Sequence, residues 1–151
     1  MWSVEPIPDN SWVYVRVFKF HCKRGQLQKS AFENTPRDGD NLSCDWDRYS
    51  TPESSRALIG RQKNREGLYK NPLDFFIWKF SVQKLREFEL HQQTVKHEPI
   101  YNDPEQDGIP NNQAHSAIYG QKRDENKDND AKFRVRLARA GEWAIPPSDN
   151  T

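Results

Sequence analysis

The sequence predicts a single α+β domain over residues 1–151, in which two or three helices pack on a mixed or mostly antiparallel sheet. Two stretches, 12–20 and 75–80, are apolar and have the length of buried strands. Residues 51–53 have the composition of a helix start. Between these segments the chain is rich in Pro, Asn and Asp, which predicts long polar loops. We find no internal repeat and no second domain.

Composition indicates that the chain is folded and gives no support for a strong nucleic-acid binder. Only 30 of the 151 residues are Leu, Ile, Val or Phe, which is close to the proportion at which disorder is expected. However, the net charge is only +1 and aromatic residues reach 12%, whereas disordered chains are usually highly charged and poor in aromatics. Lys and Arg (23) barely outnumber Asp and Glu (22), so no basic excess favours nucleic acid as a partner.

No sequence feature directs the chain to a membrane or out of the cell. The N-terminus lacks a basic segment followed by an apolar run, and the longest apolar run, 75–78, is far shorter than a membrane span. Without a secretion signal, Cys22 and Cys44 are expected to be reduced thiols. We therefore expect a cytoplasmic location and no membrane partner.

The clearest strand is 12–20, which follows an extended, proline-containing lead-in over residues 1–11. Both of its faces are largely apolar, as in a strand that is covered on two sides. Arg16 interrupts the aromatic face, and an unpaired guanidinium is too costly to bury. It therefore needs an anionic partner or must reach water. This partner is either a carboxylate of the chain, which is the more frequent arrangement, or a bound anion.

Residues 21–50 predict loops and short extended pieces, with turns at 34–36 and 38–40. Within them, 41–47 alternates as a strand with one polar face does. Its apolar side consists of Leu42, Cys44 and Trp46, and its polar side of Ser43, Asp45 and Asp47.

The next elements are a helix and a charged connection. Thr51 is a suitable N-cap, Pro52 fits the first helical position, and an acidic residue follows. This predicts a helix to about Ile59 that stops at Gly60, and a polar connection over 61–71.

The second buried strand, 75–80, is followed by Ser81, which can cap a helix over 82–89. Residues 90–100 predict a further strand, and 101–112 a surface loop. Residues 121–130 carry charges of both signs and no apolar side chain, which indicates a solvated loop.

The last element, 131–145, fits both a helical and an alternating apolar pattern. Asp130 as an N-cap favours the helix, and the two prolines at 146 and 147 end it, leaving 146–151 as a tail.

The stretch 111–120 places one histidine, His115, among small, apolar and amide residues. Histidine suits general acid/base catalysis, Asp45 is the candidate to orient it, and Arg16 to hold a phosphate or carboxylate. Further binding candidates are Ser43, Asn112, Trp46 and Tyr119. In the alternative interpretation His115 only bonds backbone carbonyls, and Asp45 forms a buried ion pair with Arg16.

The sequence predicts no cofactor and no metal. His91 and His97 are about 20 Å apart on a strand, too far to share an ion. A zinc shell of His21, Cys22, Cys44 and His115 lacks the paired spacing of such sites. The chain has no glycine-rich phosphate loop, nucleophile elbow or His-Glu-x-x-His helix.

Several short motifs occur in a recognisable order. They are Arg16 on the first strand, Ser30-Ala31-Phe32, Leu42-Ser43-Cys44-Asp45, Asn112 to Gly120, Phe133 to Leu137, and Trp143-Ala144-Ile145. This order resembles a loose group of small uncharacterised bacterial proteins with the pattern AF…LSVD…NxAHxxIxG…RVxL…W. The resemblance implies a bacterial or phage-related origin and supplies no activity. Cys44 departs from the group, because an aliphatic residue is expected there.

Two functions remain open. The first is a bacterial intracellular accessory or binding protein that contacts a protein partner, or a nucleotide or nucleic acid, through its loops and exposed aromatics. Candidates for such contacts are Trp46, Tyr49, Tyr69 and Tyr101. The second is a small enzyme that acts on a nucleotide or other phosphorylated substrate with His115 as general acid/base. It requires His115, Asp45 and Arg16 to meet in one pocket.

Overall fold

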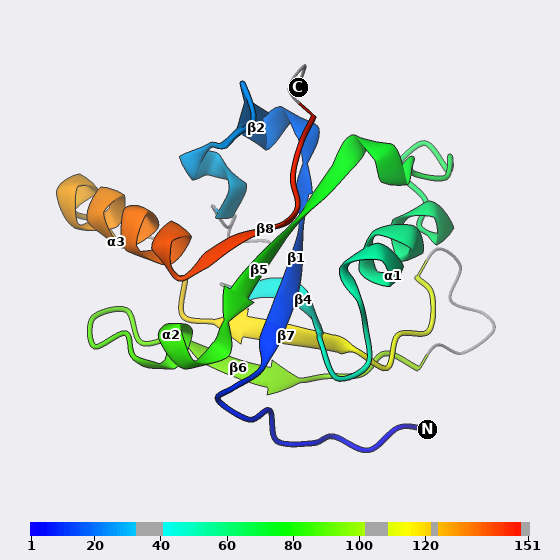
Figure 1. Cartoon of the computed structure of the whole chain (residues 1–151), viewed down its shortest axis with the longest axis horizontal. Helices are drawn as coiled ribbons and strands as arrows, with labels where there is room; N and C mark the ends of the chain where they lie inside the picture. The colour runs from blue at the N-terminus through cyan, green and yellow to red at the C-terminus, as the bar shows by residue number, and fades with distance from the viewer. Residues whose placement is uncertain (33–40, 102–108, 122–123, 149–151) are drawn as a thin grey trace.

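The computed structural model describes residues 1–32, 41–101, 109–121 and 124–148. Their main feature is a six-stranded sheet of order β6-β7-β4-β1-β5-β8, in which every strand pair is antiparallel (Figure 1). The strands are β1 (Trp12–Phe18), β4 (Asn41–Trp46), β5 (Phe75–Ser81), β6 (Thr94–His97), β7 (His115–Tyr119) and β8 (Gly141–Ile145). A separate hairpin pairs β2 (Cys22–Lys23) with β3 (Gln26–Leu27). The α+β prediction is confirmed.

The described residues also contain three α-helices: α1 (Pro52–Ala57), α2 (Val82–Arg86) and α3 (Lys127–Arg139). Short 3₁₀ helices cover Lys19–His21, Lys29–Phe32, Leu58–Arg61 and Pro72–Asp74. Figure 1 shows α1 on one side of β1 and β5, and α3 on the other. Among the helices of the described residues, none combines the length and the hydrophobicity that a membrane-spanning helix requires.

The sheet turns sharply between β1 and β4. β1 pairs with β5 along all seven residues, but with β4 only at Val13↔Trp46 and Tyr14↔Asp45. In Figure 1, β1 runs up the view and β5 runs down it, whereas β6 and β7 run across it. Beyond Tyr14 the two strands therefore diverge, and side chains of both line the space between them.

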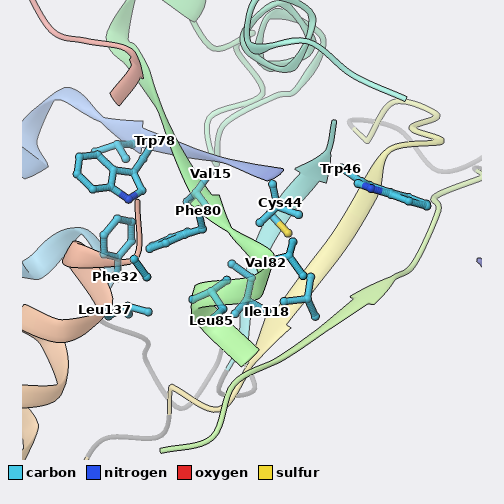
Figure 2. Close-up of a cluster of buried hydrophobic side chains, with 14 of the residues drawn as sticks. Val15, Phe32, Cys44, Trp46, Trp78, Phe80, Val82, Leu85, Ile118 and Leu137 are labelled. Carbon is cyan, nitrogen blue, oxygen red and sulfur yellow. The ribbon is translucent and has the colours of Figure 1, made fainter. Parts of the chain in front are cut away.

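The main core lies on the face of the sheet opposite Arg16. It combines side chains from the sheet, from α2 and α3, and from the 3₁₀ helix Lys29–Phe32 (Figure 2). Among its largest members are Trp46, Phe80, Phe133, Leu85, Ile118 and Leu137. Trp46 is only 1% exposed, so the expectation that it would be an exposed binding residue is wrong.

Both expected helix starts are confirmed. The Thr51 hydroxyl accepts a hydrogen bond from the Ser54 backbone N–H at 3.1 Å, and the Ser81 hydroxyl caps α2 in the same way. The helix ends differ from the expectation. After α1 the chain continues as a 3₁₀ turn through Arg61, and α2 ends at Arg86.

The C-terminal part requires a correction. α3 begins at Lys127 with Asn126 as its N-cap, so residues 127–130 belong to a helix and not to a loop, and Asp130 is not the cap. The helix ends at Arg139, and 141–145 forms β8 instead of continuing it. Gly141 explains the change, because its backbone lies so close to β5 that a Cβ would sit 2.3 Å from the Lys79 carbonyl oxygen.

Other predicted elements are shorter than expected or fall outside the described residues. The strand expected over 90–100 is limited to Thr94–His97. The turns at 34–36 and 38–40, and most of the 101–112 loop, lie outside the described residues.

Candidate functional site

A pocket of about 370 Å³ lies where β1 and β4 separate. It is lined by residues of β1, of β4, of the start of β7 and of the 3₁₀ helix before β4. These are Tyr14, Val15, Arg16, Ala31, Asn41, Leu42, Ser43, Cys44, Asp45 and His115. The three residues predicted as a catalytic group, Arg16, Asp45 and His115, therefore line one pocket.

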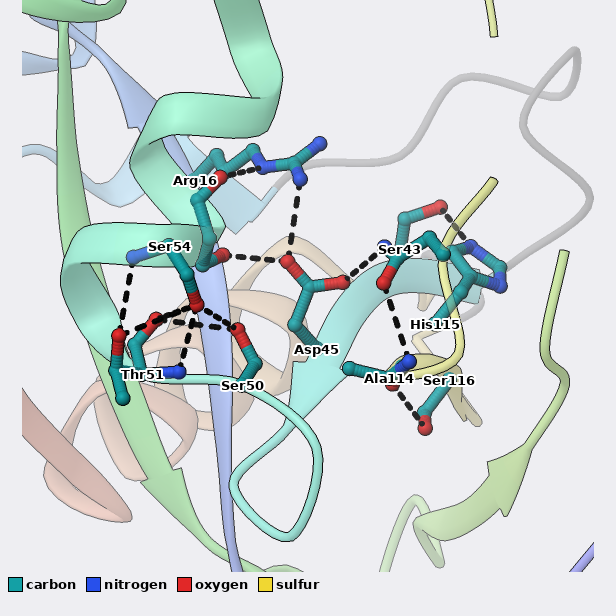
Figure 3. Close-up of polar contacts among 11 residues, drawn as sticks. Arg16, Ser43, Asp45, Ser50, Thr51, Ser54, Ala114, His115 and Ser116 are labelled. Atoms are coloured by element: carbon teal, nitrogen blue, oxygen red, sulfur yellow. Dashed lines mark hydrogen bonds and ion pairs between the residues drawn. The ribbon is translucent and has the colours of Figure 1, made fainter. Parts of the chain in front are cut away.

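Asp45 is the centre of the polar network at this pocket (Figure 3). The residue is only 3% exposed. Its carboxylate accepts three hydrogen bonds. Arg16 Nη2 donates to Oδ2 at 3.1 Å, the Ser55 hydroxyl donates to the same oxygen at 2.5 Å, and Asn112 Nδ2 donates to Oδ1 at 2.7 Å. These donors come from β1, α1 and the segment before β7. Asp45 therefore joins three separate parts of the fold.

Arg16 is held from two sides. Its Nε donates to the Ser55 carbonyl oxygen at 3.0 Å and its Nη2 to Asp45, which places α1 over this face of the sheet. The expected ion pair with a carboxylate of the chain is thus present. Within the described residues Nη1 has no hydrogen-bond partner, and the side chain remains 22% exposed. Its remaining N–H groups can serve a ligand in the pocket.

His115 is oriented by a backbone carbonyl and not by Asp45. Its Nδ1 lies 2.7 Å from the carbonyl oxygen of Glu98, and a carbonyl can only accept. Nδ1 of the neutral ring must therefore carry the proton, which leaves Nε2 as an acceptor. The expectation that Asp45 orients His115 is wrong, although the two residues are direct partners in the β4–β7 ladder.

Ser43 lies beside His115 on the same face of the sheet. Residues 43 and 45 are two apart on β4, and His115 stands opposite Asp45, so Ser43 and His115 are diagonal cross-strand neighbours. Ser43 Oγ is 3.4 Å from His115 Nε2. Ser43 is exposed, so its hydroxyl faces the open part of the pocket.

Two other predicted binding residues support the site from outside the pocket. The Asn112 side chain is buried; besides bonding Asp45, its Oδ1 accepts the Ala114 N–H at 3.1 Å. The Tyr119 hydroxyl donates to Glu98 Oε2 at 2.5 Å, and this hydrogen bond is the main cause of the raised pKa of Tyr119. Tyr119 therefore anchors the residue whose carbonyl orients His115.

Sequence reasoning missed Ser55 and Glu98. A serine in a short helix looks like a solvent-facing residue, and only the packing of α1 on the sheet shows that Ser55 is fully buried beside Asp45. Glu98 acts through its main chain, which every residue type possesses. Neither role can therefore be recognised from the residue type in the sequence.

Neither cysteine adds chemistry to the pocket. Both are buried, and they form no disulfide with each other. Burial, followed by the charges of Asp45 and Glu98, raises the pKa of the Cys44 thiol well above its usual value. No group of three or more His, Cys, Asp or Glu side chains in the described part of the chain is placed to hold a metal ion.

The tyrosines that were candidates for contacts with a partner differ in exposure. Tyr69 is 66% exposed and Tyr101 is 58% exposed. Tyr49 is half-buried and its ring stacks on that of His97, with 6.0 Å between the centroids. None of them lines the pocket between β1 and β4.

The chain matches no protein-family model, no curated protein and no solved structure. The chemistry of the pocket is therefore inferred from its own residues. Arg16 supplies N–H groups that can donate hydrogen bonds to a ligand. His115 supplies a basic ring nitrogen, Nε2, because the Glu98 carbonyl sets the tautomer of the imidazole.

Proposed function

We propose that this protein is a small enzyme that binds a nucleotide or another phosphorylated compound in the pocket between β1 and β4. His115 Nε2 acts as general acid/base, and Arg16 binds the phosphate. The observation that carries the proposal is that Arg16 and His115 line the same pocket while the imidazole proton is held on Nδ1 by Glu98.

The size and lining of the pocket agree with a small ligand. A volume of about 370 Å³ lies within the range of roughly 300–1,000 Å³ that is typical of small-molecule sites. Leu42, Val15 and Ala31 provide apolar lining, and the polar side chains supply the few directed contacts that such sites use. Asp45 offsets the charge of Arg16, so the phosphate is held by directed N–H bonds more than by net positive charge.

The position of Asp45 gives it a positioning role. Because its two oxygens already accept from Arg16, Ser55 and Asn112, it has little capacity left for a ligand. It instead fixes the Arg16 guanidinium against β4. Ligand contact is left to Arg16, Ser43 and His115.

A specific observation favours a second function. Phe20, Leu68, Tyr69 and Leu73 are large apolar side chains that are all more than 60% exposed. Exposed apolar side chains mark a binding surface where they form a contiguous patch. The accessory-protein function would use these residues and would leave the pocket without a role.

A thermal-shift screen against nucleotides, ADP-ribose donors, inorganic phosphate, short DNA and short RNA tests the proposal. A compound that binds only the folded state raises the melting temperature by mass action. We expect a nucleotide or ADP-ribose compound to raise it in the wild type, and to do so less in His115→Gln and Arg16→Lys. Arg65→Gln, which changes an exposed arginine outside the pocket, should behave as the wild type.

The proposal is overturned if none of these compounds shifts the wild type. It is also overturned if His115→Gln and Arg16→Lys show the same shifts in melting temperature as the wild type. A shift with short DNA or short RNA that is lost when Tyr69 and Tyr101 are replaced would instead support the accessory function.

A further inference from the structure

The pocket contains a chain of three groups that the acid/base proposal uses only in part. Ser43 Oγ lies 3.4 Å from His115 Nε2 (Figure 3). On the other side of the ring, His115 Nδ1 lies 2.7 Å from the Glu98 carbonyl oxygen. A hydroxyl, an imidazole base and an acceptor that orients the base follow one another in this order. This is the arrangement that activates a serine as a nucleophile.

The direction of the hydrogen bonds agrees with this order. Because the Glu98 carbonyl fixes the proton on Nδ1, Nε2 can only accept, and the Ser43 hydroxyl is the donor of the pair. A distance of 3.4 Å is long for a formed hydrogen bond. Catalytic hydrogen bonds in free enzymes are often this long and shorten when substrate binds.

We propose that Ser43 is a catalytic nucleophile that attacks the phosphorus of a phosphate ester bound by Arg16. This inference rests on the proposed function and adds a covalent step to it. The bond between Ser43 Oγ and phosphorus forms while the bond from phosphorus to the leaving oxygen breaks. His115 Nε2 takes the hydroxyl proton and passes it to the leaving oxygen. Water then attacks the phosphorus of the phosphoserine, so that a bond from the water oxygen to phosphorus forms while the bond from phosphorus to Ser43 Oγ breaks. His115 takes the proton of the water and returns it to Oγ, and the phosphate leaves with the Ser43 hydroxyl restored.

The surroundings of Ser43 distinguish it from the other hydroxyl and thiol groups of the site. Ser116 is fully buried and its hydroxyl bonds the Ala114 carbonyl. Cys44 points to the opposite face of β4 and is buried. Ser55 donates to Asp45 and is fully buried. Ser43 is the exposed member of this set.

A second serine–histidine pair in the same chain provides a matched control. Ser30 Oγ lies 3.0 Å from His21 Nδ1, which is closer than the pair at Ser43. However, within the described residues nothing accepts a hydrogen bond from His21 Nε2, so this ring lacks an orienting partner. If a short distance alone activated a serine, Ser30 would be the more reactive of the two.

A fluorophosphonate probe tests the inference, because it transfers its phosphorus to an activated serine and releases fluoride. The wild type, Ser43→Ala, His115→Gln and Ser30→Ala are treated with the probe, and labelling is followed by intact mass and by peptide mapping. We expect one label per chain on Ser43 in the wild type and in Ser30→Ala, and none in Ser43→Ala. We expect His115→Gln to slow labelling by about 100-fold or more, which is the usual effect of losing a general base.

Circular dichroism and thermal melting of each variant show that it is folded; Ser43 is exposed, so its loss should leave the fold unchanged. Labelling of a different serine, equal labelling rates in the wild type and His115→Gln, or no labelling of the folded wild type overturns the inference. If phosphorylated compounds still raise the melting temperature in that case, the proposed function stands without the covalent step. Labelling of Ser43 without binding of any phosphorylated compound would keep the nucleophile and overturn the phosphate ester as its substrate.

Discussion

Replacing Asp45 by Asn should destabilise the fold far more than its small change in shape suggests. Oδ2 accepts from both Arg16 and Ser55, so the single amide oxygen of Asn must take that position. The new NH₂ group then faces the NH₂ of Asn112, where two donors oppose each other. Asn112 cannot turn around without loss, because its own oxygen accepts the Ala114 N–H.

The expected cost has two parts. A buried donor left without a partner costs about 1–3 kcal/mol. Weakening the charge-assisted bond to Arg16 adds roughly 1 kcal/mol, a reduced figure because the Arg16 side chain is 22% exposed. The free energy of unfolding should therefore fall by about 2–4 kcal/mol. For a domain of this size, that lowers the melting temperature by roughly 4–16 °C.

Asp74→Asn is the matched control. Asp74 pairs with Lys19 at 3.1 Å, the same distance as in the Arg16–Asp45 pair, but both side chains are more than a third exposed. An exposed pair contributes only about 0–1 kcal/mol. Urea unfolding of both variants measures the difference. If Asp45→Asn costs no more than Asp74→Asn, Asp45 does not hold β1, α1 and the Asn112 segment together.

Two further predictions concern backbone packing and pH. Gly141→Ala should lower the free energy of unfolding by about 2–3 kcal/mol, because the added Cβ would meet the Lys79 carbonyl oxygen at 2.3 Å and Trp78 Nε1 at 2.4 Å. In urea unfolding it should cost more than Gly25→Ala, where the strain of a positive φ of 76° adds about 1–2 kcal/mol but nothing lies within 4 Å. Cys44, whose pKa is raised by burial, should make stability fall as the pH rises above about 8.5, because the unfolded chain then releases a thiol proton that the folded chain keeps. Cys44→Ala should flatten this fall by up to about 1.4 kcal/mol per pH unit; an unchanged slope in urea unfolding between pH 8 and 10 would contradict the assignment.

The elements that sequence reasoning placed correctly have local signals. β1 and β5 are continuous apolar runs, and the starts of α1 and α2 carry capping residues at the position where the helix begins. Alternation along 41–47 already put Trp46 and Asp45 on opposite faces. Applied consistently, it also shows that the two residues cannot serve one site.

The rest depends on contacts between distant parts of the chain. The apolar residues of 131–145 fit both a helical and an alternating pattern, and the boundary between α3 and β8 is set by the close approach of Gly141 to β5. The pairing of β4 with β7 joins residues about 70 positions apart, and no local pattern encodes its register. That register brings Ser43 and His115 together.

The location of Asp45 explains how one fold keeps both a stable sheet and an open pocket. The pairing of β1 with β4 ends at Tyr14↔Asp45, so the ladder stops at the residue that carries the central carboxylate. From that point the bond that Arg16 donates to Asp45 joins the two strands, while Ser55 and Asn112 fix the Asp45 carboxylate in place. The pocket exists because the strands diverge, and the network limits how far they do so. A ligand that takes up Arg16 would therefore act on the same bonds that stabilise the sheet, which couples occupancy of the pocket to the stability of the β1–β4 junction.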